Sequence, residues 1–253
     1  FQLKDKVDMF LRSLCPLKFQ KRHPILLEQK ENKHEYLNKI SKIKQHIQRG
    51  DIYEMNYCLE YFSNDVLLNA EDLFLNLNNI SKTPFSAFLH INEHYVLCAS
   101  PERFLRKKHN HVISQPIKGT IRRGSNTNED EKLIDELKNS QKDISENVMI
   151  TDLVRNDLSI TAEKSSVNVD EFCKVYTFEK VHQMISTISS KIDKNVHFTD
   201  LLESVFPMGS MTGAPKLRAM ELIEQYEQFK RGLFSGSIGY ITPEGDFDFN
   251  VII

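Results

Sequence analysis

The segment Pro207-Met-Gly-Ser-Met-Thr-Gly-Ala-Pro-Lys216 is the most informative part of this sequence. Its glycines and hydroxyl side chains precede a helix that we predict over residues 214–226, and Pro215 suits the first turn of that helix. Free backbone N–H groups and the helix dipole at such a start attract an anion, and Lys216 adds a positive charge. The spacing is not that of a Walker A loop, so a carboxylate fits as well as a phosphate. A helix-capping loop without a ligand is an equally good interpretation at this point.

The segments on either side of this loop predict a mixture of helices and strands. Apolar residues at helical spacing predict helices over residues 33–50, 67–77, 128–156, 199–206 and 214–226. Aromatic and β-branched runs predict strands over residues 52–62, 84–99 (two strands joined by a turn at 92–93), 111–117, 235–242 and 246–253. The strands come in antiparallel runs between blocks of helix, so we expect an α+β fold and not a doubly wound parallel sheet.

Composition excludes several classes of protein. The 253 residues are 40% apolar, enough for one large domain or two small ones. They include 33 Lys and Arg against 35 Asp and Glu, and the formal net charge of −2 argues against a dedicated nucleic-acid binder. No apolar run approaches the ~20 residues needed to cross a bilayer. The four cysteines, Cys15, Cys58, Cys98 and Cys173, lack C-x-x-C spacing, and the N-terminal segment lacks signal-peptide features. We therefore expect free thiols in a cytoplasmic protein.

Two short motifs at strand ends contain candidate catalytic side chains. Lys118 precedes a glycine in Pro116-Ile-Lys-Gly-Thr120, where a partly buried lysine can lose its proton and act as a nucleophile or base. Glu102 lies in Ser100-Pro-Glu-Arg-Phe104 at the end of an apolar strand, where a carboxyl group can keep its proton and act as a general acid. Taken singly, each has a simpler interpretation: a surface lysine in a basic turn, and a surface ion pair of Glu102 with Arg103.

Asp143, Glu146 and Asn147 share one face of the predicted helix 128–156. Their oxygen atoms can bind a hard divalent cation such as Mg²⁺, although such residues more often form a solvated helix face. His182 stands alone among apolar residues, a setting more typical of a hydrogen-bonded core residue than of a catalyst. Together the candidates indicate a small anionic substrate that is handled with a divalent metal.

The combination of motifs is more specific than its parts. Five occur in one order: Ser100-Pro-Glu-Arg-Phe104, Pro116-Ile-Lys-Gly-Thr120, Ser145-Glu-Asn-Val-Met-Ile-Thr-Asp-Leu-Val-Arg-Asn-Asp157, Gly209-Ser-Met-Thr-Gly-Ala-Pro-Lys216 and Gly236-Ser-Ile-Gly-Tyr240. This set closely resembles the chorismate-utilising enzymes. The resemblance implies an α/β sandwich with stacked antiparallel sheets inside and helices outside. It also implies a dicarboxylate substrate, chorismate, with one carboxylate bound through Mg²⁺ and the other by backbone amides and basic side chains.

The resemblance assigns roles to residues of this chain. Glu146 matches a metal-ligand glutamate, and Asp143 falls where some members have a second acidic residue near the metal. Glu102 matches the general acid that protonates the departing C4 hydroxyl, and His182 matches a histidine near that hydroxyl. The substrate-binding loops are matched by Thr120, Gly209, Ser210, Gly213 and Lys216.

Lys118 separates the branches of the family. The anthranilate-forming branch usually has Ala at this position, whereas Lys is typical of the branch that forms 4-amino-4-deoxychorismate. There the lysine attacks C2 of chorismate, the C4 hydroxyl leaves, and ammonia displaces the lysine by attack at C4. The resemblance thus implies an enzyme of p-aminobenzoate and folate synthesis, with ammonia supplied by a glutamine amidotransferase partner. An anthranilate-forming enzyme and a non-catalytic chorismate-binding module stay as alternatives.

Two features depart from the family pattern. Glu54, in Gly50-Asp-Ile-Tyr-Glu54, stands where ammonia-using members usually have Gln and water-adding members a basic Lys. An isochorismate or salicylate synthase is therefore less expected. Members also continue beyond the strand at the end of this sequence with an Arg-Thr pair and a Glu-rich helix that carries further metal ligands. We expect residues 1–253 to form a single chorismate-binding domain with a residual N-terminal segment over about 1–32. Without the C-terminal strand and helix region, we expect an incomplete metal site and little activity.

Overall fold

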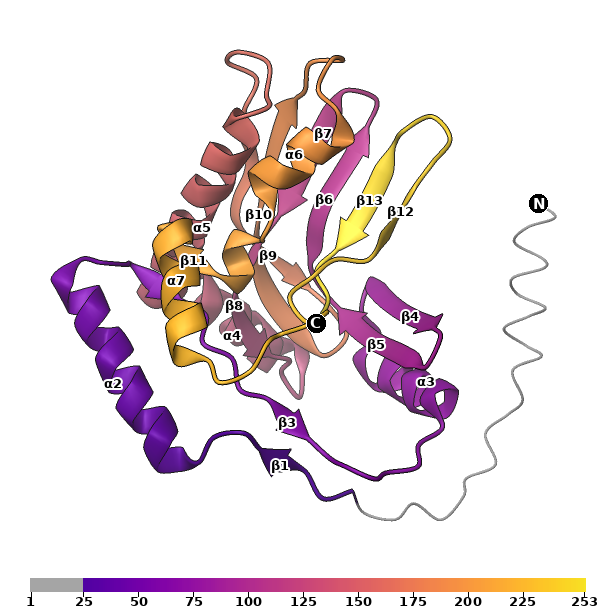
Figure 1. Ribbon diagram of the computed structural model, residues 1–253. Coiled ribbons are helices and arrows are strands. Elements are labelled where there is room, and N and C mark those ends of the chain that lie inside the picture. Colours follow the sequence, from indigo (N-terminus) through magenta and orange to yellow (C-terminus); the bar gives the residue numbers. More distant parts are fainter. Residues whose placement is uncertain (1–24) are drawn as a thin grey trace.

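The computed structural model describes residues 25–253, so Cys15 and most of the residual N-terminal segment lie outside the described residues. The α+β prediction is confirmed (Figure 1). The centre is a seven-stranded antiparallel sheet. In spatial order its strands are β12 (Gly239–Ile241), β13 (Phe247–Asn250), β6 (Arg103–Lys108), β7 (His111–Gln115), β10 (Val181–Lys191) and β8 (Ile117–Arg122), and β9 (Asn168–Thr177) pairs with β10.

Strand β10 organises this sheet. Its second half pairs with β7, where Ile188 lies opposite Ser114. Its first half pairs with β8, where His182 lies opposite Ile121, and β9 runs along its other edge. Because most of β10 is buried on both faces, its sequence lacks the alternation of a half-buried strand. The sequence did not predict this strand, nor β6 and β9, and the strand predicted over 111–117 corresponds to β7 and only the first residue of β8.

Two helices cover the sheet over its main core (Figure 1). They are α5 (Gln141–Ser159) and α6 (Phe198–Val205). Buried side chains from the helices and from the strands beneath them interlock in this core, including Leu105, Val112, Ile150, Leu158, Ile188, Leu201 and Val251. Because its apolar side chains are buried in this core, α5 has a fixed orientation, and this orientation sets the direction in which its polar side chains point.

The single helix predicted over residues 128–156 is wrong, because the chain forms α4 (Thr127–Asn139) and then α5. Ser140 lies between them in an extended conformation and ends α4. Its side chain accepts a hydrogen bond from the backbone N–H of Asp143, which caps the start of α5. Val148 on α5 is an apolar residue that stays 42% exposed.

The N-terminal elements follow the predictions in part. Helix α2 (Lys33–Arg49) is confirmed, with Asn32 in a capping box at its start and Gly50 at φ +80° after its end. The hairpin predicted over 84–99 is confirmed as β4 (Phe85–Ile91) and β5 (His94–Ser100).

Other predicted elements differ in length or position. The strand expected over 52–62 is reduced to β2 (Glu54–Met55) and β3 (Tyr61–Phe62), and β3 pairs with β1 (Glu28–Gln29). Helix α3 (Ala70–Ser81) starts later than predicted because Asn69 caps it. The hairpin expected over 235–253 is confirmed in shorter form as β12 and β13.

The loop at 207–216 lies against the N-terminal part of the described chain. It contains a 3-10 turn (Gly209–Met211) and β11 (Gly213–Ala214), and it leads into α7 (Lys216–Tyr226). Strand β11 pairs with β2. Gly213 has φ +152°, and a Cβ there would lie 2.3 Å from the backbone carbonyl oxygen of Glu54. Glycine is therefore needed for this close approach.

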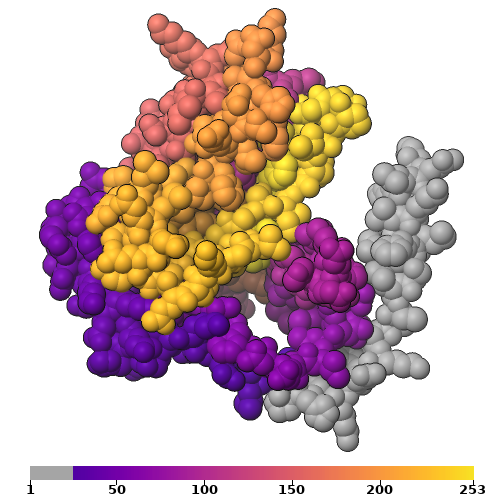
Figure 2. Space-filling view, viewed as in Figure 1, coloured from indigo at the N-terminus to yellow at the C-terminus, as the bar shows by residue number. Residues whose placement is uncertain are grey.

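Helices α2 and α7 share a second, smaller core. It consists of Ile43, Ile52, Ala219, Leu222 and Tyr226. Figure 2 shows the indigo surface of the N-terminal helix directly beside the orange surface of α7. This contact holds β2, and with it Glu54, next to the loop at 207–216.

Within residues 25–253, no helix combines the length and apolar character needed to span a membrane. The cysteines in this part of the chain are free thiols, as predicted, and they are Cys58, Cys98 and Cys173.

Candidate active site

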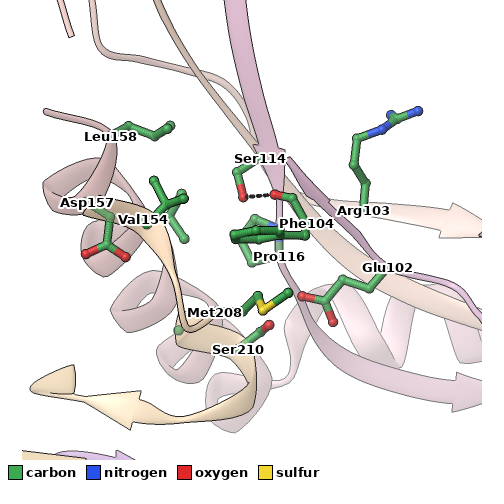
Figure 3. Close-up of a pocket in the computed structure, with 12 residues that line it drawn as sticks. Glu102, Arg103, Phe104, Ser114, Pro116, Val154, Asp157, Leu158, Met208 and Ser210 are labelled. Atoms are coloured by element: carbon green, nitrogen blue, oxygen red, sulfur yellow. Dashed lines mark hydrogen bonds between the residues drawn. The ribbon is translucent and has the colours of Figure 1, made fainter. Parts of the chain in front are cut away.

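Glu102 lies at the junction of β5 and β6 and is 5% exposed. Figure 3 shows its carboxyl group beside Ser210 and Met208, at the edge of a 20 Å³ cavity with room for about one water molecule. Burial raises the pKa of Glu102 to about 7, although a hydrogen bond with Ser210 and the charge of Lys118 oppose the increase. The carboxyl group therefore keeps a large protonated fraction near neutral pH.

The simpler interpretation of Glu102, a surface ion pair with Arg103, is wrong. The Arg103 guanidinium group binds Asp248 instead, with Nε 2.9 Å from Oδ1 and Nη2 3.1 Å from Oδ2. It also donates to Oε1 of Gln115 at 2.6 Å. Arg103 thus fastens β13 to β6 and β7, and Glu102 is left to face the cavity.

Lys118 lies on β8 with its side chain only 13% exposed, so the surface-lysine interpretation is wrong. Its Nζ is 3.4 Å from Oε1 of Glu54 and 3.3 Å from Oδ1 of Asn56. Asn56 in turn donates from Nδ2 to the backbone oxygen of Ser210 at 2.6 Å. A continuous set of contacts therefore joins the candidate nucleophile, the loop at 207–216 and the candidate acid, Glu102.

Helix α5 holds the Lys118 strand in place through Asn147. This buried amide donates from Nδ2 to the backbone oxygens of Lys118 at 3.3 Å and Met184 at 3.2 Å. Its Oδ1 accepts from the hydroxyl groups of Ser186 at 2.5 Å and Thr151 at 3.3 Å. The structure does not support Asn147 as a metal ligand, because its oxygen is occupied by these two donors.

Glu146 and Asp143 lie on the same helix with partly exposed carboxylates. Nζ of Lys142 is 3.1 Å from Oε1 of Glu146 and 3.9 Å from Oδ1 of Asp143, so one cation can sit close to both. In the part of the chain that the structure describes, no three metal-binding side chains of His, Cys, Asp or Glu gather around one point. Two carboxylates still fit Mg²⁺, which usually keeps several waters and takes substrate oxygens as further ligands.

His182 belongs to a buried hydrogen-bond network. It is fully buried, with Nε2 2.9 Å from Oδ1 of Asp130 and Nδ1 2.9 Å from Oγ1 of Thr177. Asp130 also binds the guanidinium group of Arg123, which holds its pKa well below the usual range. His182 is thus a hydrogen-bonded core residue whose ring holds α4 against β10, and its catalytic role stays a prediction.

Lys216 forms a buried ion pair. Its Nζ is 2.5 Å from Oδ2 of Asp157 and 3.1 Å from the backbone oxygen of Val205. Burial raises the pKa of Asp157 to about 6, and the charge of Lys216 limits the increase. The pair joins α7 to α5 at the cavity, which Asp157 lines, a structural role that the sequence did not predict. Substrate binding by Lys216 stays a prediction.

Replacing Lys216 tests this pair. We expect Lys216→Met to destabilise the protein by about 3–5 kcal/mol at pH 8, because it leaves a buried carboxylate without a partner. The folded protein binds the Asp157 proton more tightly than the unfolded chain, whose pKa is near 3.8. Without the charge of Lys216 the pKa of Asp157 should rise further, so the loss of stability should shrink as the pH falls from 8 toward about 6 and be smallest at pH 5. Urea unfolding at pH 5 and pH 8 measures this.

The matched control is the double variant Lys216→Met with Asp157→Leu, which removes both charges. It should recover most of the lost stability, because an apolar pair can replace a buried ion pair. Equal stability of the single variant and the wild type would contradict the structural role.

Two further residues at the site were missed by the sequence reasoning. Gln183 donates from Nε2 to Oγ1 of Thr120 at 3.4 Å, while its buried Oε1 has no hydrogen-bond partner among the described residues. Such an oxygen is a candidate acceptor for a substrate hydroxyl. Arg231 donates to the backbone oxygens of Met211 at 2.7 Å and Asn56 at 2.8 Å, and so ties the loop to the segment after β2. No sequence signal marks either residue, because both act through contacts distant in the chain.

Residues 2–253 match the family model described as chorismate binding enzyme. This chain belongs to the chorismate binding enzyme family. Aminodeoxychorismate synthase component 1 of Klebsiella aerogenes is 39% identical over 222 residues, which are 88% of this chain and 49% of that protein. Aminodeoxychorismate synthase of Arabidopsis thaliana chloroplasts is 41% identical over 228 residues, which are 88% of this chain and 25% of that protein.

Solved structures of chorismate binding enzymes show the same fold. Anthranilate synthase component I from Streptococcus pneumoniae superimposes with a TM-score of 0.82 at 26% identity, covering 100% of this chain and 57% of that one. The family and fold implied by the ordered motifs are therefore confirmed. The chain spans about half the length of the first curated relatives that it matches.

Proposed function

We propose that the protein converts chorismate and ammonia to 4-amino-4-deoxychorismate, as the names of its aminodeoxychorismate synthase relatives indicate for them. The observation that carries the proposal is the contact set that joins Lys118 to Glu102 through Asn56 and Ser210. It supports a site at which an amine nucleophile and a protonated acid act on the same substrate. In this proposal residues 1–253 are one chorismate-binding domain.

The proposed reaction uses two residues of this chain in turn. The Nζ lone pair of Lys118 forms a bond to C2 of chorismate, the two ring double bonds both shift, and the C4–oxygen bond breaks. Glu102 gives its proton to the departing hydroxyl group, which leaves as water. Ammonia then bonds to C4, both double bonds shift back, and the C2–nitrogen bond to Lys118 breaks. The new ammonium group loses a proton and the Glu102 carboxylate regains one, which returns the site to its starting state.

The surrounding residues bind and orient the substrate in this proposal. The loop residues Gly209, Ser210 and Gly213, together with Thr120, supply polar contacts to chorismate, and Gln183 accepts a hydrogen bond from a substrate hydroxyl. Glu146 and Asp143 would hold Mg²⁺, whose charge would neutralise a chorismate carboxylate. A glutamine amidotransferase partner would supply the ammonia, which agrees with the name "component 1" of the bacterial relatives.

An anthranilate-forming enzyme is the second candidate, favoured by the structural similarity to an anthranilate synthase component I. Product identity separates the two. The full-length protein, incubated with chorismate, ammonium and Mg²⁺, should accumulate aminodeoxychorismate in a chromatographic assay. Fluorescent anthranilate without aminodeoxychorismate would refute our proposal. Tight chorismate binding without any product would favour a non-catalytic module.

A further inference from the structure

Asn56 follows β2, and its backbone is fixed from two sides. Its N–H donates to the backbone oxygen of Thr212 at 2.8 Å, and its C=O accepts from Nη2 of Arg231 at 2.8 Å. The guanidinium group of Arg231 is itself held by the carboxylate of Glu227, whose side chain is 2% exposed. The side chain of Asn56 therefore starts from a fixed position beside the loop at 207–216.

The amide group of Asn56 uses both of its ends. Oδ1 accepts a hydrogen bond from Nζ of Lys118 at 3.3 Å, and Nδ2 donates to the backbone oxygen of Ser210 at 2.6 Å. Because an amide carries its acceptor and its donor at fixed positions, it makes both contacts in one orientation only. A carboxylate of the same size cannot replace it, since a carboxylate has no N–H to give to the oxygen of Ser210.

The amine of Lys118 needs such a contact because it ends a flexible four-carbon stem. Asn147 on α5 holds the backbone of Lys118 but leaves this stem free to rotate. Within residues 25–253, Asn56 is the residue that accepts a hydrogen bond from Nζ, and Oε1 of Glu54 lies 3.4 Å from the same nitrogen. A neutral amine has two N–H bonds and one lone pair. When the N–H bonds are directed toward these two oxygens, the lone pair points to the remaining side.

The other end of the amide connects Lys118 to the candidate acid. The side chain of Ser210 makes a hydrogen bond with the carboxyl group of Glu102, and the two lie side by side in Figure 3. The backbone of Ser210 is in turn held by Asn56. A shift of this one amide would therefore move the nucleophile relative to the acid. A misplacement of about 1 Å in an active site can lower a rate by about 10²-fold.

We infer that Asn56 is a positioning residue, whose amide sets the direction of the Lys118 lone pair and the position of Lys118 relative to Glu102. The inference rests on the proposed function. This role requires neither contact with the substrate nor proton transfer by Asn56, because the residue acts through Lys118. Loss of the amide should therefore slow turnover much more than it weakens chorismate binding.

The variant Asn56→Leu removes both hydrogen bonds and keeps the approximate size of the side chain. In the full-length protein with saturating ammonium, kcat for aminodeoxychorismate formation should fall by about 10²-fold, whereas the Kd of chorismate should change by less than about threefold. Turnover assays and a chorismate titration without ammonium measure the two quantities. The matched control is Asn38→Leu, at an exposed position on α2, which should change neither.

The variant Asn56→Asp tests the contact with Lys118 without chorismate. It keeps the shape of the side chain, so we expect it to fold, and it places a negative charge where Oδ1 lies 3.3 Å from Nζ. That charge favours the ammonium form of Lys118. Acetic anhydride acylates neutral amines, and mass spectrometry reads the modification of Lys118. Labelling should be about 10-fold slower than in the wild type and unchanged in the control Asn38→Asp.

The inference requires the loss of kcat in Asn56→Leu to exceed the loss of chorismate affinity by more than about tenfold. A smaller difference, or an unchanged kcat, would overturn it and show that Asn56 only shapes the loop at 207–216. Unchanged labelling in Asn56→Asp would also overturn it, because the amide would then not hold Nζ. If the wild type forms no aminodeoxychorismate, the proposed function itself fails, and labelling still decides whether Asn56 holds Lys118.

Discussion

Lys118→Ala should lower the rate of aminodeoxychorismate formation by about 10³-fold or more in the full-length protein, the scale of loss seen when a covalent nucleophile is removed. Chorismate binding should persist, because the loop at 207–216 and the carboxylates of α5 are unaffected. The substitution also leaves the half-buried Glu54 without its cation. Turnover with saturating ammonium and a separate chorismate titration measure the two effects.

The control for this variant is Lys180→Ala, which removes a lysine whose side chain is 59% exposed. It should leave both turnover and binding unchanged. Unchanged turnover of Lys118→Ala would remove Lys118 as the nucleophile. Recovery of its rate by high ammonium would indicate direct attack of ammonia at C4, a route without a lysine adduct.

Glu102→Gln should lower turnover by about 10²–10⁴-fold and at the same time stabilise the protein. Glutamine cannot protonate the departing hydroxyl group, which explains the loss of rate. The gain in stability follows from the pKa of Glu102, which is about 7 in the folded protein and near 4.5 in the unfolded chain. The folded state therefore binds a proton that the unfolded chain releases, and stability declines as the pH rises from about 4.5 to 7.

Glutamine has no proton to lose, so the variant does not lose stability at this position as the pH rises. At pH 8 the stability gain of Glu102→Gln has an upper bound of about 3 kcal/mol, since a tenfold change in a protonation equilibrium is about 1.4 kcal/mol. The gain should shrink as the pH is lowered toward 5. Thermal or urea unfolding at both pH values measures it, with the exposed Glu244→Gln as the control. A variant that retains full turnover would refute the acid role, and a stability gain equal at both pH values would refute the buried, proton-binding state.

Much of the fold could be predicted because some signals are local. Helix α2 is set by its cap at Asn32 and by Gly50, and the β4–β5 hairpin by its own turn. The failures have physical reasons. Strand β10 is buried on both faces, so it shows no alternation, and Ser140 can be read as an ordinary helix residue until its hydroxyl is seen to cap α5.

The candidate site, like the fold, could be predicted from the sequence only in part. The ordered motifs predicted the family and marked Lys118, Glu102 and Glu146 as residues of interest, because their identities and local spacing already carry the chemistry. Their burial could not be predicted, and it separates the buried Glu102 from an ordinary surface glutamate. Nor could the sequence show that Lys216 forms an ion pair with the buried Asp157.

The sequence by itself determined the family, the α+β class and the identity of the chemical groups, because these depend on residue types and on spacing within short segments. Only the tertiary structure decided which groups meet. Glu54 lies next to Lys118 because β2 pairs with β11 and α2 packs on α7. The ring of His182 is buried and contacts Asp130. Such contacts join residues far apart in the chain, and long-range strand pairing and burial, not local pattern, set both their distances and their protonation.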